Sequence, residues 1–275
     1  MWGSVATYTG DCATERPALG CSSGVDIQIR LIRSATLRIE YAGRTFIIDP
    51  YLAAKHAMPS YTGASPNPLM DLPCAPEAVI DGIEMALISH LHSDHFDPAA
   101  RRLLPKELPI LCQPGDAAAL GKQGFANLLP VDDVRMWQGI TIRRVAGQHG
   151  SGDVLREMGE ASGFVFQAND APTVYWVGDT VWTEAVADTL RLYRPEVVIT
   201  HSGGAMWGDH VLIIMDAAQT VEVCRAAPES IVVAVHMESL DHLTVSRREL
   251  RAYASSHGIE ADRLLIPQDG EDLML

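Results

Sequence analysis

Cysteine is scarce in this sequence and never occurs in a metal-binding spacing. The 275 residues contain only five cysteines, and no two of them form a C-x-x-C pair. An odd number of scattered cysteines in a chain of this length indicates reduced thiols and excludes a disulfide framework. A structural zinc site built on thiolates is excluded as well. The cysteines are Cys12, Cys21, Cys74, Cys112 and Cys224.

Long hydrophobic runs are also missing. Every apolar run is far shorter than the ~20 residues that a bilayer requires, so no membrane partner is expected. The first ten residues lack a basic segment followed by an apolar stretch, which is the pattern of a signal peptide. The sequence therefore predicts a cytoplasmic protein.

Positive charge is in short supply. Lys and Arg number 21 against 35 Asp and Glu, which gives a net charge of −14. Binding to a phosphate backbone or to an anionic membrane surface depends on Lys and Arg, so the charge balance disfavours both, and no nucleic-acid partner is expected. A bound metal ion can still reverse the field locally and attract an anionic small molecule.

The rest of the composition is that of a globular protein. Hydrophobic residues make up 47% and charged residues 20%, which excludes disorder, and no heptad pattern persists that would indicate a coiled coil. Residues 1–25 are rich in Gly, Ser and Thr without periodicity, so we expect an irregular lead-in there. Residues 26–275 are expected to form a single domain.

Strand and helix patterns follow one another twice in the same order. Each half begins with a β-rich stretch and continues with strands that alternate with helices, and a Pro-rich loop over 56–76 interrupts the first half. Helices at this spacing need a sheet to pack on, so the pattern predicts an α/β (α+β) fold with two sheets face to face and helices outside both. The expected strands are 27–31, 37–41, 45–48, 85–89, 110–112, 140–146, 163–167, 173–177, 196–200, 231–235 and 264–266. The expected helices are 97–104, 116–120, 182–192, 216–226 and 247–257.

One segment concentrates metal-binding side chains. Between a buried strand and a helix, three histidines and one aspartate fall within six residues, although the whole chain has only 10 histidines. Alternate residues of an extended backbone point the same way, so His90 and His92 can bind one ion. The following turn directs Asp94 and His95 toward a second position. Imidazole and carboxylate ligands suit Zn, Fe or Mn.

This H-x-H-x-D-H segment after an apolar strand resembles the signature of the metallo-β-lactamase fold superfamily. The further metal positions of that superfamily match His149 in Gly-Gln-His-Gly, Asp179 in Gly-Asp-Thr, and His236 after the strand 231–235. The resemblance implies a four-layer αββα sandwich of two mixed sheets. It also implies a first metal site of His90, His92 and His149, a second of Asp94, His95 and His236, and Asp179 between them.

The chain is most similar to the branch related to L-ascorbate-6-phosphate lactonase, often described as metal-dependent hydrolases. Asp49, in an Asp-Pro-Tyr sequence after the third strand, matches a supporting aspartate that orients a ligand histidine. The chain departs from the pattern at Ser34, where relatives often carry a Gly-His pair. It also departs at 200–204, where a Thr-His-Ser-Gly-Gly sequence replaces a more apolar run.

The resemblance implies two divalent metal ions, with zinc favoured over manganese or iron. Water shared by such ions ionises near neutral pH, and Asp94 would hold it toward the substrate as a catalytic residue. The implied reaction is hydrolysis of an ester, lactone or amide in a small molecule. Two alternatives stay open: a phosphodiesterase or nuclease of the same fold, and an iron-bound member that does not hydrolyse. Relatives often self-associate, so a homo-oligomer is also considered.

Several other residues are candidates for the site. His201 ends an apolar strand, where it could stabilise an oxyanion or protonate a leaving group, or merely cap the strand. Near His236, the residues Glu238, Asp241 and His242 compete for its role, but the place of His236 at a strand end favours it. Residues from the neighbouring loops are expected to line a substrate pocket. They are Tyr51, His56, Tyr61, Trp207 and His210.

Overall fold

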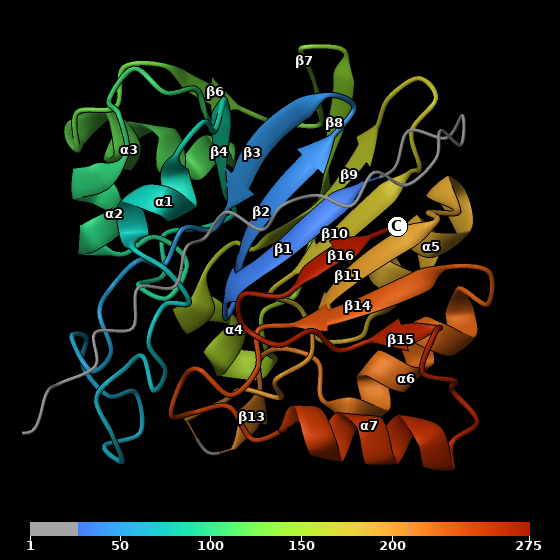
Figure 1. The fold of residues 1–275 in the computed structure, drawn as a ribbon. Coiled ribbons are helices and arrows are strands. Elements are labelled where there is room, and N and C mark those ends of the chain that lie inside the picture. Colours follow the sequence, from blue (N-terminus) through green and yellow to red (C-terminus); the bar gives the residue numbers. More distant parts are fainter. Residues whose placement is uncertain (1–26, 209) are drawn as a thin grey trace, which may run out of the picture.

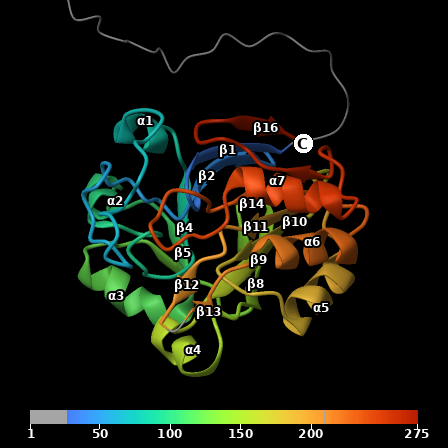
Figure 2. The same cartoon turned by 90° about the horizontal axis from the view of Figure 1, so that it is seen from below.

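Two seven-stranded sheets face one another in the computed structural model of this protein (Figure 1). The structure describes residues 27–208 and 210–275, so the lead-in expected at 1–25 lies outside the described residues. Seen from below, helices α1, α2 and α3 lie on one side of the sheets and α5, α6 and α7 on the other (Figure 2). The four-layer αββα architecture is thereby confirmed.

The first sheet has the strand order β16-β1-β2-β3-β4-β5-β6. Its N-terminal strands form an antiparallel meander, as the alternation of apolar residues predicts, and β3 to β6 run parallel. The strands are β1 (Gln28–Arg33), β2 (Thr36–Tyr41), β3 (Arg44–Ile48), β4 (Met85–Ile88), β5 (Ile110–Cys112), β6 (Leu128–Pro130) and β16 (Asp272–Met274). The helices on its outer face are α1 (Pro76–Ile80), α2 (Pro98–Leu103) and α3 (Ala117–Lys122), the last preceded by the 3₁₀ turn Pro114–Asp116.

The second sheet has the strand order β15-β14-β11-β10-β9-β8-β7. It is antiparallel from β7 to β10 and parallel from β10 to β15. The strands are β7 (Val134–Trp137), β8 (Ile140–Ala146), β9 (Ser162–Gln167), β10 (Val174–Gly178), β11 (Val197–His201), β14 (Ile231–Val235) and β15 (Leu264–Leu265). The helices outside it are α5 (Glu184–Tyr193), α6 (Ala217–Ala226) and α7 (Arg247–Ser256).

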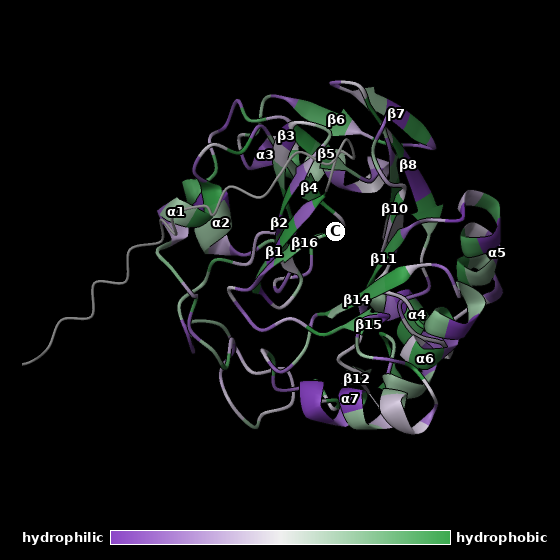
Figure 3. Ribbon diagram, turned by 45° about the vertical axis from the view of Figure 1, so that its right-hand side comes forward, coloured by the Kyte–Doolittle hydropathy of each residue, from purple (hydrophilic) through white to green (hydrophobic). Residues whose placement is uncertain are grey.

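The core lies mainly between the sheets, where buried hydrophobic residues of both sheets pack together. Figure 3 shows stretches of hydrophobic residues in the strands of both sheets. Strands covered on both faces carry continuous apolar runs, because a helix packs behind them. In β4, all four residues Met85–Ile88 are buried, and Met85 and Leu87 face the other sheet while Ala86 and Ile88 face the helices. Among the described residues, no helix is long and apolar enough to cross a membrane.

Short elements account for most differences from the expected secondary structure. Helices α1 and α4 (Gly152–Met158), strands β6, β7 and β16, and the small hairpin of β12 (Met206–Trp207) and β13 (Val211–Leu212) are not among the predicted elements. These segments have two to seven residues, too few for a hydrophobic period to show. Two of them, α4 and the β12–β13 hairpin, lie beside the candidate site.

Candidate metal centre

The predicted metal-binding residues meet at one edge of the paired sheets. Each follows the carboxyl end of a strand, which is where sites in α/β folds collect. The H-x-H-x-D-H segment follows β4, His149 follows β8, Asp179 follows β10 and His236 follows β14. The His236 backbone has a φ of 58°, which a non-glycine residue rarely adopts. Gly203 packs so closely beneath it that a Cβ would lie 2.2 Å from the His236 carbonyl oxygen.

The ligand atoms form two groups that a carboxylate joins. Within each group, the ligand atoms lie within 4.8 Å of one another. The Oδ2 atom of Asp179 lies 3.2 Å from Nε2 of His95, 3.4 Å from Nε2 of His149 and 3.9 Å from Nε2 of His90. Asp179 therefore occupies the position of a bridge between two sites. One group consists of His90, His92 and His149, and another of Asp94, His95 and His236. Asp179 belongs to two further groups that overlap these, one with His90 and His95 and one with His201 and His236.

Hydrogen bonds turn the Nε2 atoms of these histidines toward the centre. Nδ1 of His95 lies 2.7 Å from Oδ2 of Asp49, and Nδ1 of His149 lies 2.8 Å from the carbonyl oxygen of Ile213. Since a carboxylate and a carbonyl oxygen only accept, each Nδ1 carries a hydrogen, and Nε2 is the nitrogen that can bind a metal ion when the ring is neutral. This is the usual outer arrangement around a metal-binding histidine.

Two serines complete this outer layer. Oγ of Ser89 lies 2.9 Å from Nδ1 of His90 and donates to Asp49 at 2.7 Å. Oγ of Ser34 lies 3.1 Å from Nδ1 of His236. Ser34 is the position at which the chain departs from the pattern of its relatives, and its hydroxyl partners a histidine of the second group. Asp49 thus orients His95 directly and His90 through Ser89.

The cluster contains buried carboxylates and crowded imidazoles whose pKa values are strongly shifted. Burial and the neighbouring His95 and His92 hold the pKa of His90 well below its ordinary value. Burial works to raise the pKa of Asp179, but His95, His149 and His236 outweigh it and hold that pKa well below its ordinary value. Buried imidazoles crowded around buried carboxylates are costly unless a positive charge joins them. This donor set, with its lone pairs turned inward, fits a pair of divalent metal ions.

The two oxygens of the Asp94 carboxylate face different partners. Oδ2 of Asp94 faces His236 at 3.5 Å and His95 at 3.7 Å, while Oδ1 accepts a hydrogen bond from Tyr61 Oη at 3.3 Å. Oη of Tyr61 also lies 2.6 Å from Oγ of Ser93. Tyr61 belongs to the Pro-rich loop. The Asp241 carboxylate accepts hydrogen bonds from this loop and holds it in place.

His201 is placed differently from the sequence prediction. It is fully buried, its Nδ1 lies 2.5 Å from Oδ1 of Asp179, and its ring packs edge-on against Trp176 with centroids 5.0 Å apart. Burial lowers the pKa of His201 to about 4, although the bond to Asp179 works to raise it. A strand-end histidine can turn to either face of the sheet, and this one turns inward. The predicted contact with substrate is thus corrected: His201 positions Asp179.

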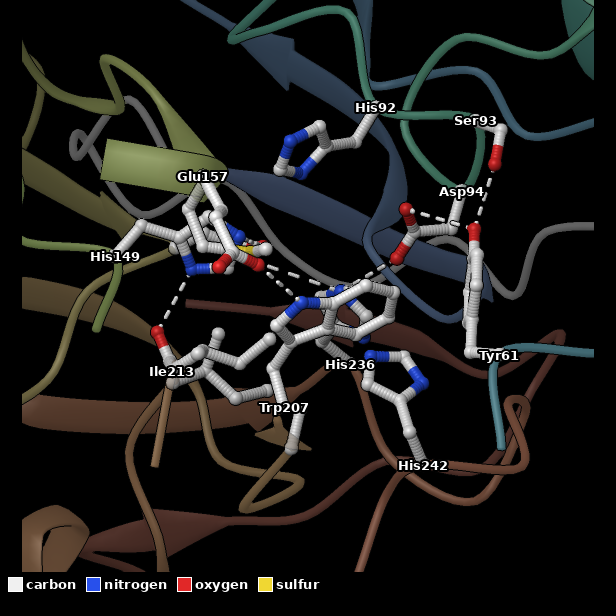
Figure 4. Close-up of a pocket in the computed structure, with 14 residues that line it drawn as sticks. Tyr61, His92, Ser93, Asp94, His149, Glu157, Trp207, Ile213, His236 and His242 are labelled. Carbon is white, nitrogen blue, oxygen red and sulfur yellow. Dashed lines mark hydrogen bonds and ion pairs between the residues drawn. The ribbon is translucent and has the colours of Figure 1, made fainter. Parts of the chain in front are cut away.

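A cavity of about 240 Å³ opens over the ligand groups (Figure 4). The metal-binding side chains form one part of its surface, and a mostly apolar wall from α4 and the segment around the β12–β13 hairpin forms another. Trp207 on this wall donates from Nε1 to Glu157 at 3.1 Å. The lining residues are Tyr61, His92, Ser93, Asp94, His149, Glu157, Met158, Asp179, Ala205, Trp207, Ile213, Ile214, His236 and His242.

The predicted pocket residues are only partly brought together. Tyr61 and Trp207 line the cavity, whereas His210 lines an adjoining outer cavity. Tyr51 is fully buried with the Arg33 guanidinium 4.9 Å above its ring, and His56 is exposed on the loop. Neither lines the cavity, because Tyr51 turns into the protein and His56 into solvent, so both predictions are wrong.

Most residues of the apolar cavity wall cannot be recognised in the sequence. Ile213, Ile214 and Met158 belong to a small hydrophobic cluster around α4 and the β12–β13 hairpin, and no periodicity marks them. The sequence indicates His242 only as a competitor of His236. It lines the cavity and packs edge-on against Tyr61, with ring centroids 4.8 Å apart.

Comparisons with known proteins agree with this geometry. A family profile described as "Beta-lactamase superfamily domain" matches residues 44–237. The UPF0173 protein YddR of Bacillus subtilis is 34% identical over 251 residues, which cover 89% of this chain and 98% of that protein. A UPF0173 metal-dependent hydrolase of Methanocorpusculum labreanum is 32% identical over 181 residues, covering 61% and 71% of the two chains.

Two solved structures are similar over nearly their whole length. The isothiocyanate hydrolase from Delia radicum gut bacteria is 38% identical, has a TM-score of 0.83, and is matched over 90% of this chain and 98% of its own. A possible metal-dependent hydrolase from Veillonella parvula is 34% identical with a TM-score of 0.86, over 90% and 99% of the chains. The chain therefore belongs to the beta-lactamase superfamily, and within it to the UPF0173 metal-dependent hydrolases.

Proposed function

We propose that this chain hydrolyses a small, uncharged and largely apolar molecule at an electrophilic carbon bonded to nitrogen, oxygen or sulfur. The size and the lining of the cavity are the observations that support this proposal. Its size of about 240 Å³ suits a small molecule, and its wall is mostly apolar. No Lys or Arg occurs among the described residues that line it, so it offers no fixed cation to a phosphate or carboxylate group.

Isothiocyanates are the first substrates to test within this class. The similar isothiocyanate hydrolase, at 38% identity, supports this choice. The reaction balances with one water: R–N=C=S and H₂O give a thiocarbamate, whose C–N bond breaks to release the amine R–NH₂ and carbonyl sulfide. Esters, lactones and amides present a carbon of the same electrophilic kind and form the rest of the class.

A divalent metal pair, zinc by preference, would supply a Lewis acid and lower the pKa of water to about 7. The side chains of the protein have separate tasks. Asp94 is oriented by Tyr61 and faces the cavity beside His236, where it can direct a water molecule toward the substrate. The wall around Trp207 and Ile213 excludes other water and holds the apolar part of the substrate.

The test is a metal analysis of the purified protein joined to a substrate screen. The screen contains benzyl isothiocyanate, phenyl acetate, a γ-lactone, an anilide and bis(4-nitrophenyl) phosphate. We expect zinc-dependent turnover of at least one of the first four, and fastest turnover of the isothiocyanate. Preference for the phosphodiester would favour a phosphodiesterase instead. Redox-active iron without any hydrolysis would favour the non-hydrolytic alternative.

A further inference from the structure

One polar side chain in the cavity has no partner. Outside the ligand set, the other polar side chains that line the described cavity are engaged: Ser93 with Tyr61 at 2.6 Å, Tyr61 with Asp94 at 3.3 Å, and Trp207 with Glu157 at 3.1 Å. His242 is only 8% exposed, and its Nδ1 is buried without any hydrogen-bond partner. Neither ring nitrogen of His242 has a hydrogen-bond partner among the described residues, so the ring keeps its hydrogen-bonding capacity for a ligand.

The fold holds this imidazole in a fixed place. The backbone oxygen of His242 accepts from Met206 N at 3.2 Å. The preceding Asp241 donates its N–H to Oδ1 of Asn67 at 2.9 Å. The ring packs on Tyr61 (Figure 4). The backbone contacts and the packing on Tyr61 thus hold His242 at the cavity, although none of the candidate metal groups among the described residues includes it.

The ring is neutral and has one hydrogen to donate. Burial is the main effect and lowers the pKa of His242, although the charge of Asp94 works to raise it. A neutral imidazole carries one N–H. Buried backbone N–H groups are rarely left without a partner. The same cost favours the tautomer in which the buried Nδ1 of His242 carries no hydrogen. The hydrogen therefore lies on Nε2, which makes no hydrogen bond with any described residue.

We propose that His242 is a catalytic residue that donates a hydrogen bond from Nε2 to the substrate heteroatom on which negative charge develops. In an ester this atom is the leaving oxygen, and in an isothiocyanate it is a heteroatom of the N=C=S group. His242 keeps its proton, and water protonates the product. A donor aimed at developing charge inside a water-poor cavity contributes strongly to catalysis. This inference rests on the proposed hydrolase function.

The kinetic test compares His242→Phe, which keeps the ring but removes the donor, with His242→Gln, which keeps an N–H. Phenyl acetates with leaving groups from 4-nitrophenol to phenol are the substrates, and His257→Gln, at the exposed end of α7, is the matched control. We expect His242→Phe to lower kcat by roughly 10²-fold on phenyl acetate and far less on 4-nitrophenyl acetate. His242→Gln should recover part of the loss. An equal loss across the series, or a change in KM alone, would overturn the proposal.

Binding of thiocyanate tests His242 without turnover. Calorimetry with the zinc-loaded protein should show about tenfold weaker thiocyanate binding in His242→Phe, as expected for one lost hydrogen bond to an anion, and no change in His257→Gln. Unchanged affinity in His242→Phe would contradict the proposal. If the wild type hydrolyses none of the screened substrates but this loss is seen, the proposed function fails and the donor role stands.

Discussion

Asp179 and His201 form a buried pair in which the histidine holds one oxygen of the carboxylate. Nδ1 of His201 lies 2.5 Å from Oδ1 of Asp179, while Oδ2 of the same carboxylate faces His95 at 3.2 Å and His149 at 3.4 Å. The oxygen that would bridge the metals is thereby separated from the oxygen that the protein holds.

Replacing His201 should therefore lower the affinity of the protein for zinc. His201→Leu removes the donor and leaves Oδ1 of Asp179 unpaired, and we expect zinc affinity to fall about 10- to 100-fold. Competition with a chromophoric chelator measures this. His201→Gln, which keeps an N–H, should fall less. Equal affinity in the wild type and His201→Leu would show that Asp179 needs no such support.

Tyr61→Phe should reduce turnover while leaving the metal content unchanged. The lost hydroxyl frees Oδ1 of Asp94, which can then tilt, but all the ligand side chains remain. We expect kcat to fall roughly tenfold, as for other outer partners of metal ligands. Tyr253→Phe on α7 is the control. A loss of zinc in Tyr61→Phe would mean that the Pro-rich loop holds the metal centre together.

Asp241 should stabilise the Pro-rich loop in a pH-dependent way. Its carboxylate accepts from Tyr61 N, Thr62 N and Oγ1, and Asn67 Nδ2 at 2.7–3.1 Å, and from Ser60 Oγ. Desolvation works to raise the pKa of Asp241, but the bonds from Ser60, Thr62 and Asn67 outweigh it and lower that pKa. A carboxyl whose pKa is lower in the folded state stabilises fully above its unfolded pKa of about 3.9.

Asp241→Ala should accordingly lower the free energy of unfolding by about 1–2 kcal/mol at neutral pH, a modest value because the group is partly exposed. The difference from the wild type should shrink as the pH falls below about 4, through the pKa of the folded state. Urea unfolding at a series of pH values measures it. A difference that is constant down to the acid limit would contradict the role of the charge.

Loss of a ligand from either group should abolish hydrolysis and leave the fold intact. His92 is half-buried at the cavity surface and Asp94 faces the cavity, so His92→Ala and Asp94→Ala remove ligands without opening the core. We expect background rates with an unchanged circular dichroism spectrum. Normal rates in both variants would refute the site.

The local parts of this account could be predicted from the sequence. The segment His90–His95 concentrates its ligands between one strand and one helix, so short-range geometry suffices. The cap of α7 is equally local: Ser246 and Glu249 form the capping box that the spacing indicates. The two-sheet architecture also follows from the order of strands and helices, because each element needs a partner for its apolar face.

The parts that depend on distant contacts could not be predicted. Nothing near His201 indicates that its ring turns toward Asp179, since that direction depends on packing against Trp176. The cavity wall comes from elements too short to show a hydrophobic periodicity. Strand β16 pairs with the edge strand β1, which is distant in the sequence. Ser34 and His236 are 202 positions apart in the sequence, so their hydrogen bond is seen only in the folded structure.

The most direct test of the central claim is the number of metal ions bound per chain. After equilibration with excess zinc and removal of free metal, mass spectrometry should find about two zinc ions per chain in the wild type and about one in His92→Ala, which loses a ligand of only the group His90, His92 and His149. A wild-type chain that retains no zinc, or a content that neither His92→Ala nor His236→Ala changes, would contradict the account.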